Sequence, residues 1–493
     1  MPELFIVGRG TKTVLTDSGL DRRAAGYYST PGFVAQFLAE QLLHLAPDAE
    51  SVFDPCVGKE ELLAPFIDLE LPCTGYDIEN FAASHQYVCH FERRDFLEFY
   101  ARWKNSSRRK PLPHDLLVAN PPYNCHEADY VRAHKKRLSD AFPEVGVGNM
   151  FAMFVAALID MAADGAFIGL LTFDSFLTAR MHAALRRRIL SQCAVHLVAL
   201  CPTDLFHQQN ADVRTCIIIL QKGNQHQLPS VKTANRPPDT RRFKKQLDSG
   251  SFSRTPFADL MLGETDHLQF VIGCPADVRT LFEGPRLGDV FACATGISTG
   301  NDARYISARR RAPFTVPFYK NPGRQRFRYE GVQFIDANFL EISRAVPNFI
   351  VRNHHLLFKE GISCSSMGVS FAATYLPAGA LFGVNANIFP ESEDIWWLLA
   401  YLNSTLVTYL VRGVLLRTNM ITSGYVSRIP LISLSAAQKR RLTSIARRAF
   451  ASGTQPFAAE IAAIDEVIFG AAKISDASRE FIQSFCSDLL RST

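Results

Sequence analysis

The sequence lacks the features that mark membrane proteins and disulfide-stabilised secreted proteins. No apolar run reaches the roughly 18 positions of a membrane helix, and residues 1–10 contain no basic leader ahead of an apolar stretch. The 11 cysteines are scattered without a C-x-x-C pair, which argues against a zinc knuckle and a disulfide framework. We therefore expect a cytoplasmic protein with no membrane partner and no metal site.

A strong excess of charge is also missing. Lys and Arg total 53 against 48 Asp and Glu, which leaves a net charge of +5. That balance permits nucleic-acid binding but does not indicate it, so local clusters have to decide. The length is more informative, because 493 residues, 47% of them hydrophobic, can form two separate cores.

Short apolar runs alternate with helical patterns between about residues 30 and 220. Thr30 and Pro31 have the residue types of an N-cap and a first helical position, and apolar residues recur at helical spacing from Phe33 to Leu43. This alternation predicts an α/β fold with a doubly wound, mostly parallel sheet. The predicted strands are residues 51–53, 73–76, 115–119, 166–171, 195–200 and 214–220.

The character of the chain changes beyond this region. Residues 222–246 are polar and basic and contain Pro237 and Pro238, which predicts a long loop. From about Gly284 to Pro390 the predicted strands are short and irregular, and helical periodicity returns at 396–411 and from Ser435 onward. We predict two domains, residues 1–280 and residues 281–493, the second a mixed α+β domain with C-terminal helices.

Acidic residues follow the first predicted strands at the edge where open α/β sheets bind ligands. Asp54 and Gly58 come after the first strand, and Asp77 ends the second, where a carboxylate can accept hydrogen bonds from ribose hydroxyls. Asp95 can accept from an adenine amino group, with Phe96 beside the ring. Each residue also has a structural explanation, but their order and spacing together favour an adenosyl cofactor.

The tetrapeptide Asn120-Pro121-Pro122-Tyr123 ends a predicted strand. The exocyclic amine of adenine is a poor nucleophile, so a catalyst must hold it in line with the methyl donor. The Asn120 side-chain oxygen and the Pro121 carbonyl can each accept one amino hydrogen, and the two prolines restrict the backbone. Tyr123 offers an aromatic face to a base flipped from the helix. A plain Pro-Pro turn is the alternative explanation.

These motifs, in this order, resemble the gamma-class (TaqI-like) DNA adenine-N6 methyltransferases. The chain is also similar to the PglX methyltransferases of BREX phage defence and to DISARM-type methyltransferases. Residues 26–31 match the first cofactor motif, which precedes the Asp-Pro motif in the gamma order. The resemblance implies a Rossmann-like methyltransferase domain that uses S-adenosyl-L-methionine and flips its target base. It implies a catalytic role for Asn120, Pro121, Pro122 and Tyr123, and cofactor-binding roles for Tyr28, Thr30, Pro31, Asp54, Pro55, Gly58, Asp77, Ile78, Asp95, Phe96 and Asn120.

The loop after Gly58 departs from the family pattern. The family commonly has a small residue and a second glycine there, whereas this chain has Lys59 and Glu60. A Glu near the cofactor's carboxylate is unfavourable unless it is turned away, and Lys59 could pair with that carboxylate instead. We therefore expect cofactor binding that is weak, or that needs DNA or a partner protein.

The resemblance continues into the second predicted domain. Residues 296–302 resemble the Gly-x-x-Thr-Gly-x-Asn segment that opens the specificity region, and residues 317–320 resemble its aromatic-Lys segment. The stretch from residues 399–406 through Arg417 and Thr418 to Ile429 and Pro430 resembles its ending. Basic and aromatic residues alternate between 304 and 328 with few acids nearby, which suits a phosphate-contacting surface, although a solvated charged face or simple turn residues also explain the pattern. The candidate DNA-binding residues are Thr299, Asn301, Arg309, Arg310, Lys320, Arg324 and Arg326.

Several functions remain open. Asn-Pro-Pro-Tyr also serves methylation of RNA adenine and of protein glutamine, and the large basic second domain favours double-stranded DNA over both. A catalytically weak DNA-recognition subunit of a defence assembly is a further alternative, motivated by Lys59 and Glu60. The sequence shows no convincing nuclease constellation or P-loop. We therefore expect any restriction or phage-defence activity to lie in partner proteins.

Overall fold

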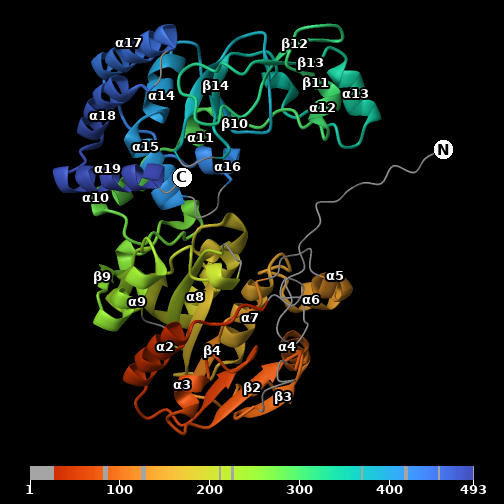
Figure 1. The fold of residues 1–493 in the computed structure, drawn as a ribbon, viewed down its shortest axis with the longest axis vertical. Coiled ribbons are helices and arrows are strands. Elements are labelled where there is room, and N and C mark those ends of the chain that lie inside the picture. Colours follow the sequence, from red (N-terminus) through yellow and green to blue (C-terminus); the bar gives the residue numbers. More distant parts are fainter. Residues whose placement is uncertain are drawn as a thin grey trace. The chain divides into compact units, whose positions relative to one another are not determined.

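The computed structural model describes residues 27–80, 87–123, 129–209, 213–223, 227–367, 370–415, 420–453 and 456–491. Gly26, Arg417 and Thr418, named above, lie outside these ranges. The chain divides into two compact units, Met1–Gly273 and Cys274–Thr493 (Figure 1). Each unit has buried cores of its own.

Unit 1 is built on a nine-stranded sheet with the order β3-β2-β1-β4-β5-β7-β6-β8-β9. Neighbours from β3 to β5 are parallel, β7 runs antiparallel between β5 and β6, and β9 is antiparallel to β8. The predicted mostly parallel, Rossmann-like sheet is confirmed. The strands are β1 (Val52–Asp54), β2 (Cys73–Asp77), β3 (His90–Arg93), β4 (Leu116–Ala119), β5 (Phe167–Phe173), β6 (Cys193–Leu200), β7 (Thr215–Lys222), β8 (Ser230–Ala234) and β9 (Ser253–Pro256).

Helices cover both faces of this sheet, because alternate strand residues point to opposite sides. In β1, Phe53 packs into the core that also holds α4, α7 and α8, whereas Val52 packs into the core with α2, α3 and α9. Because both faces of the sheet are buried, the strands are nearly continuous apolar runs in the sequence. The helices of unit 1 are α2 (Gly32–Leu45), α3 (Ala64–Ile67), α4 (Phe96–Asn105), α5 (Asp129–Ala133), α6 (Lys135–Ala141), α7 (Met150–Met161), α8 (Ala183–Gln192) and α9 (Thr240–Ser249).

Two predictions about unit 1 are wrong in detail. Helix α2 begins at Gly32 with Pro31 as its N-cap, so Thr30 does not cap the helix. Residues 222–246 are not a long loop, because they contain β8 and most of α9. The buried Phe243 and Leu247 are four residues apart on α9, and Asp239 caps the helix. The prolines and cations of this segment obscured that pattern.

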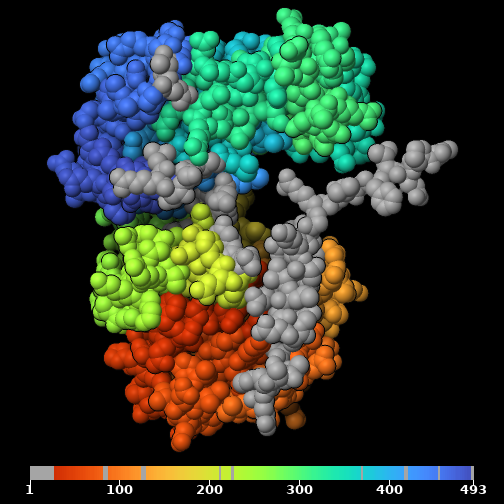
Figure 2. Space-filling view, viewed as in Figure 1, coloured from red at the N-terminus to blue at the C-terminus, as the bar shows by residue number. Residues whose placement is uncertain are grey.

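Unit 2 contains short strands and a group of C-terminal helices, as the sequence predicted. Its two four-stranded sheets have the orders β10-β17-β14-β15 and β11-β13-β12-β16. Helices α14, α15, α17, α18 and α19 gather at one side of the unit, and β11 to β13 with α12 and α13 lie at the other (Figures 1 and 2). The strands are β10 (Ala292–Ala294), β11 (Ile306–Ser307), β12 (Phe314–Tyr319), β13 (Gln333–Asp336), β14 (Gly361–Cys364), β15 (Ala373–Leu376), β16 (Leu381–Phe382) and β17 (Asn387–Phe389). The helices are α10 (Ala276–Thr280), α11 (Leu287–Val290), α12 (Asp302–Tyr305), α13 (Phe339–Ala345), α14 (Ile395–Leu402), α15 (Thr405–Tyr409), a π-helical turn (Leu410–Leu415), α16 (Ser423–Val426), α17 (Ala436–Ser452), α18 (Ala458–Ala472) and α19 (Asp476–Arg491).

Within the described ranges, no single helix is long and apolar enough to cross a membrane. One bent pair, Ile395–Leu402 with Thr405–Leu415, meets the length and composition of a span across a 59° break. Most residues of this pair are buried within unit 2.

Candidate functional site

A cavity of about 270 Å³ lies at the carboxyl ends of β1, β2 and β4. Its lining includes every predicted cofactor-binding residue except Pro31. The parallel strands explain this, because their carboxyl ends meet at one edge of the sheet. Among the catalytic candidates, Asn120 and Pro122 line the cavity, whereas Pro121 and Tyr123 do not.

Asn120 follows β4, and one polar atom of its side-chain amide is hydrogen-bonded whereas the other is not. Its Nδ2 donates to the Tyr28 carbonyl at 2.8 Å and to the Thr30 hydroxyl at 3.0 Å, and these two bonds set the orientation of the amide. Its Oδ1 is buried and has no hydrogen-bond partner among the described residues. An unpaired buried acceptor costs about 1–3 kcal/mol, so the site is prepared for an N–H donor.

Tyr123 lies in an aromatic cluster beside Asn120. Its ring centroid is 4.5 Å from that of Phe173 and 5.4 Å from that of Tyr28, and the Phe206 ring approaches edge-on at 6.1 Å. Its hydroxyl donates to the Leu171 carbonyl at 3.4 Å. Tyr28 belongs both to this cluster and to the cavity wall, so the cluster borders the cavity.

In the loop after β1, the two unusual residues, Lys59 and Glu60, lie outside the cavity lining. Glu60 occupies the position of the family's second glycine and has a φ of 65°, the left-handed region that glycine adopts without strain. Its side chain is buried, and its Oε1 accepts from the backbone N–H groups of Val88 at 3.0 Å and Cys89 at 2.8 Å. Neither Lys59 nor Glu60 lines the cavity. The Glu60 carboxylate therefore does not face the cavity.

Carboxylates dominate the electrostatics of the cavity. Burial raises the pKa of Asp54 to about 8, with Asp77 and Glu61 adding to the effect and a hydrogen bond from Cys56 N–H opposing it. Burial likewise raises the pKa of Asp77 to about 6, against hydrogen bonds from the backbone N–H groups of Glu79 and Gly58. The cavity is thus set to receive a cation or several hydroxyl donors. The described residues contain no metal-ligand cluster of three or more His, Cys, Asp or Glu.

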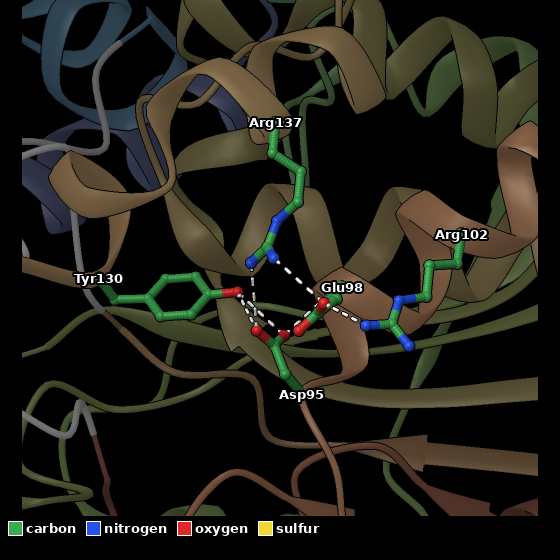
Figure 3. Close-up of polar contacts among 5 residues, drawn as sticks. All are labelled: Asp95, Glu98, Arg102, Tyr130 and Arg137. Carbon is green, nitrogen blue, oxygen red and sulfur yellow. Dashed lines mark hydrogen bonds and ion pairs between the residues drawn. The ribbon is translucent and has the colours of Figure 1, made fainter.

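Asp95 stands at the N-terminus of α4, inside a network of polar contacts (Figure 3). It accepts from the backbone N–H of Glu98 at 2.9 Å, and both of its oxygens accept from the Tyr130 hydroxyl, at 2.9 and 2.8 Å. Arg137 lies 3.4 Å from Asp95 and 3.4 Å from Glu98, which also pairs with Arg102 at 2.7 Å. Tyr130 also lines the cavity. The carboxylate predicted to hold an adenine amino group is therefore already hydrogen-bonded to α5, a helix that follows the Asn-Pro-Pro-Tyr motif.

Three residues of the site carried no sequence signal. Glu61 lines the cavity and accepts from the hydroxyls of Tyr27 and of Ser29, the latter at 2.7 Å. Gln209 exchanges two hydrogen bonds of 2.8 Å with the backbone of Ser29, which positions the segment against Asn120. Tyr130 reaches Asp95 only through the fold. Each contact joins residues more than 30 positions apart, so no local pattern could reveal it.

The candidate DNA-binding residues of unit 2 fall into different environments. The Thr299 side chain is buried and donates to Asp302 at 2.5 Å, and Lys320 pairs with the same carboxylate. Partial burial opposes ionisation of Asp302, but the hydrogen bonds from Lys320 and Thr299 hold its pKa below the ordinary value. Asn301 caps α12 by accepting from the backbone N–H of Arg304. Thr299 and Asn301 are thus engaged in local structure.

The arginines also differ among themselves. Arg309, Arg310 and Arg324 are exposed, as a phosphate-contacting role requires. Arg326 instead donates to the Asn403 carbonyl at 2.7 Å, and burial lowers the pKa of its guanidinium. We therefore revise the expectation for Arg326, whose guanidinium serves the packing of unit 2.

Comparisons with known proteins agree with the geometry of unit 1. Residues 99–254 match the family model described as N-6 DNA Methylase, a range that contains Asn120 to Tyr123. The chain is similar in structure to the type IIL restriction-modification enzyme MmeI in complex with DNA, with a TM-score of 0.61 and 10% identity over 96% of this chain and 80% of that one.

Two further structures of proteins bound to DNA share the fold. The DrdV–DNA complex has a TM-score of 0.55 and 12% identity over 87% of this chain and 57% of that one. The ATP-dependent type ISP enzyme LlaBIII bound to DNA has a TM-score of 0.56 and 10% identity over 87% of this chain and 39% of that one. The chain therefore spans 57% of DrdV and a smaller part of LlaBIII.

Proposed function

We propose that this chain is a site-specific DNA methyltransferase that transfers a methyl group from S-adenosyl-L-methionine to the N6 amino group of adenine in double-stranded DNA. The buried, unpaired Oδ1 of Asn120 at the wall of the cavity carries the proposal. The family match of residues 99–254 supports it, because that family is described as an N-6 DNA methylase.

The residues of the cavity fit the proposed cofactor. Asp77 can accept hydrogen bonds from ribose hydroxyls, and Phe96 and Ile78 provide apolar contacts for the adenine ring. Glu61, and Asp54 once its carboxyl is ionised, line the cavity and can balance the positive charge of a cationic methionine part. A side chain at Gly58 would not fit, since its Cβ would come within 2.6 Å of the Tyr27 ring. When bound, S-adenosyl-L-methionine supplies a methyl group on a sulfonium.

Asn120 acts on the amino group that receives this methyl. Its Oδ1 accepts one N6 hydrogen of adenine, and the Pro121 carbonyl accepts the other. Both bonds hold the nitrogen lone pair away from conjugation with the ring, which makes it a better nucleophile. A base within a duplex cannot reach the cavity, so the adenine must be flipped out, and the cluster of Tyr123, Tyr28 and Phe173 offers it a stacking surface.

Unit 2 would bind the DNA around the target. Arg309, Arg310 and Arg324 are exposed and suited to phosphate contacts. We place the activity in a cytoplasmic restriction-modification or phage-defence system, with any cleavage in a partner protein. The alternative of a catalytically weak recognition subunit was motivated by Lys59 and Glu60; neither residue lines the cavity, which favours the enzyme over that alternative.

Transfer of tritiated methyl groups from S-adenosyl-L-methionine to plasmid and phage DNA tests the proposal. We expect incorporation with the wild type, none with Asn120→Ala, and full incorporation with Asn105→Ala, an exposed asparagine at the end of α4. Cofactor binding by Asn120→Ala, measured by calorimetry, checks that the cavity is intact. If wild type and Asn120→Ala incorporate equally, or if both are inert with DNA and candidate partners, the proposal fails.

A further inference from the structure

Unit 2 contains a second pocket, of about 290 Å³. It lies between the segment that precedes α12, the end of β12 and the segment that follows β16. Residues of four separated stretches line it, among them Thr299, Lys320, Asn321, Ser366 and Asn385. A volume near 300 Å³ is at the lower end of the range for ligand sites. Thr299 and Lys320 were expected to contact DNA, and the structure brings them together with polar residues that the sequence did not single out.

Asn385 gives this pocket an unused hydrogen-bond acceptor. Only 3% of the residue is exposed. Its Nδ2 donates to the Ser363 hydroxyl at 2.7 Å and to the Cys364 carbonyl at 3.2 Å; turning the amide over would lose the second bond and set Oδ1 against that carbonyl oxygen. Its Oδ1 is buried and has no partner among the described residues. A Cβ on Gly383, which also lines the pocket, would lie 3.3 Å from this oxygen. Asn385 therefore presents a carbonyl acceptor and no free donor.

Donors are present on the same wall. The Asn321 Oδ1 accepts from the backbone N–H groups of Gly323 at 3.1 Å and Ser366 at 3.0 Å. Among the described residues, the Nδ2 group of Asn321 makes no hydrogen bond and can donate to a ligand. Lys320 neutralises Asp302, the acidic residue of the pocket. The pocket thus offers one acceptor with neighbouring donors, and its negative charge is compensated.

We propose that this pocket reads one base of the DNA recognition sequence, and that the base carries an exocyclic amine. Asn385 Oδ1 accepts a hydrogen from the N6 amine of adenine or the N4 amine of cytosine. Guanine O6 and thymine O4 are acceptors, so each would face the Asn385 oxygen without a hydrogen between them. Adenine fits best, because its N7 can accept from Asn321 or Lys320 at the same time. This inference rests on the proposed function, since it assigns the specificity of the same enzyme.

The test begins with the motif that the wild type methylates on plasmid DNA, mapped by single-molecule sequencing. Duplexes are then made in which each adenine or cytosine of the motif, other than the target, is replaced by the analogue without its exocyclic amine. Purine replaces adenine, and 2-pyrimidinone replaces cytosine. At one position we expect kcat/KM to fall by roughly 10-fold, the size of one lost hydrogen bond to a base.

Asn385→Ala should remove the penalty at that one position and leave the effects of the other analogues unchanged. Asn338→Ala is the matched control, because Asn338 is an exposed asparagine of unit 2 outside the pocket and should keep the wild-type pattern. Asn385 is buried, so its variant is first compared with the wild type by thermal unfolding. Asn321→Ala provides a second variant with a less buried side chain, and should reduce the effect of 7-deazaadenine at the same position.

Failure of the inference about the pocket can be distinguished from failure of the proposed methyltransferase function. A wild type that methylates a defined motif without any amine-dependent position overturns the inference even if Asn385→Ala fails to fold. An amine penalty that persists in Asn385→Ala, together with an unchanged effect of 7-deazaadenine in Asn321→Ala, also overturns it, and would leave the pocket holding only water. A wild type that methylates no DNA overturns the proposed function itself.

Discussion

The affinity of the protein for S-adenosyl-L-methionine should rise steeply with pH between 6 and 8. In the empty cavity the pKa of Asp54 is about 8, raised by burial. A positively charged ligand prefers the ionised carboxylate, so it binds the deprotonated fraction and releases a proton. That fraction is about 1% at pH 6 and about one half at pH 8, which predicts about 50-fold tighter binding at pH 8.

Ionisation of Asp77 also raises the affinity for S-adenosyl-L-methionine, over a lower pH range. Its pKa of about 6 makes it roughly half ionised at pH 6 and almost fully ionised at pH 8, which adds about a factor of two. The stability of the empty protein should change in the opposite sense. Both carboxyls hold their protons more tightly in the folded than in the unfolded chain, where their pKa is near 3.8, so this contribution is present at acidic pH. It is lost as pH rises from about 4 to 8.

Isothermal titration calorimetry in buffers of different ionisation enthalpy measures both the affinity and the number of protons released. Asp54→Asn provides the control, because it shares the ligand's own titration but lacks the carboxyl group. We expect most of the pH dependence to disappear in this variant, leaving the contribution of Asp77. A dissociation constant that changes by less than about three-fold between pH 6 and 8 would refute the reasoning, as would an unchanged pH slope in Asp54→Asn.

Four further substitutions test individual contacts. Tyr130→Phe removes the hydroxyl that donates to both oxygens of Asp95. Calorimetry should therefore show the affinity for S-adenosyl-L-methionine rising by about two- to ten-fold. Weaker binding would mean that the Tyr130 hydroxyl stabilises the complex with the cofactor. Glu60→Gly relieves a positive φ but deletes an acceptor of two backbone hydrogen bonds, so denaturant unfolding should show a net loss of about 1–2 kcal/mol, and a gain in stability would contradict this balance. Arg326→Ala should destabilise the protein by about 2 kcal/mol, because it leaves the buried Asn403 carbonyl without its donor. Arg324→Ala should unfold like the wild type but weaken DNA binding in a salt-dependent manner. Equal effects of the two variants would contradict their assignments.

The parts of the site that follow directly from strand ends could be predicted from the sequence. Asp54, Asp77 and Asn120 each come at the carboxyl end of a parallel strand, and the order of the strands brings them to one cavity. The fold class was equally accessible, because alternating strand and helix patterns have few compact solutions. The loop after Gly58 was identified as unusual, but the direction of Glu60 depends on the backbone of Val88 and Cys89, just before β3, which sequence reasoning could not place.

Contacts between distant segments could not be predicted. Tyr130 is 35 positions from Asp95, and their hydrogen bonds exist only because α5 packs beside the start of α4. Arg326 looked like a phosphate ligand because its neighbours are basic, but its guanidinium bonds to a carbonyl 77 positions away. The unsatisfied state of Asn385 is likewise invisible in sequence, since it depends on which of its two amide ends the surrounding strands satisfy.

The identity of the methylated nucleoside tests the central claim most directly. DNA treated with the protein and S-adenosyl-L-methionine is digested to nucleosides and analysed by mass spectrometry. We predict N6-methyldeoxyadenosine with the wild type and with Asn105→Ala, and none with Asn120→Ala. Methylcytosine as the product, or N6-methyldeoxyadenosine at wild-type levels from Asn120→Ala, would contradict the account.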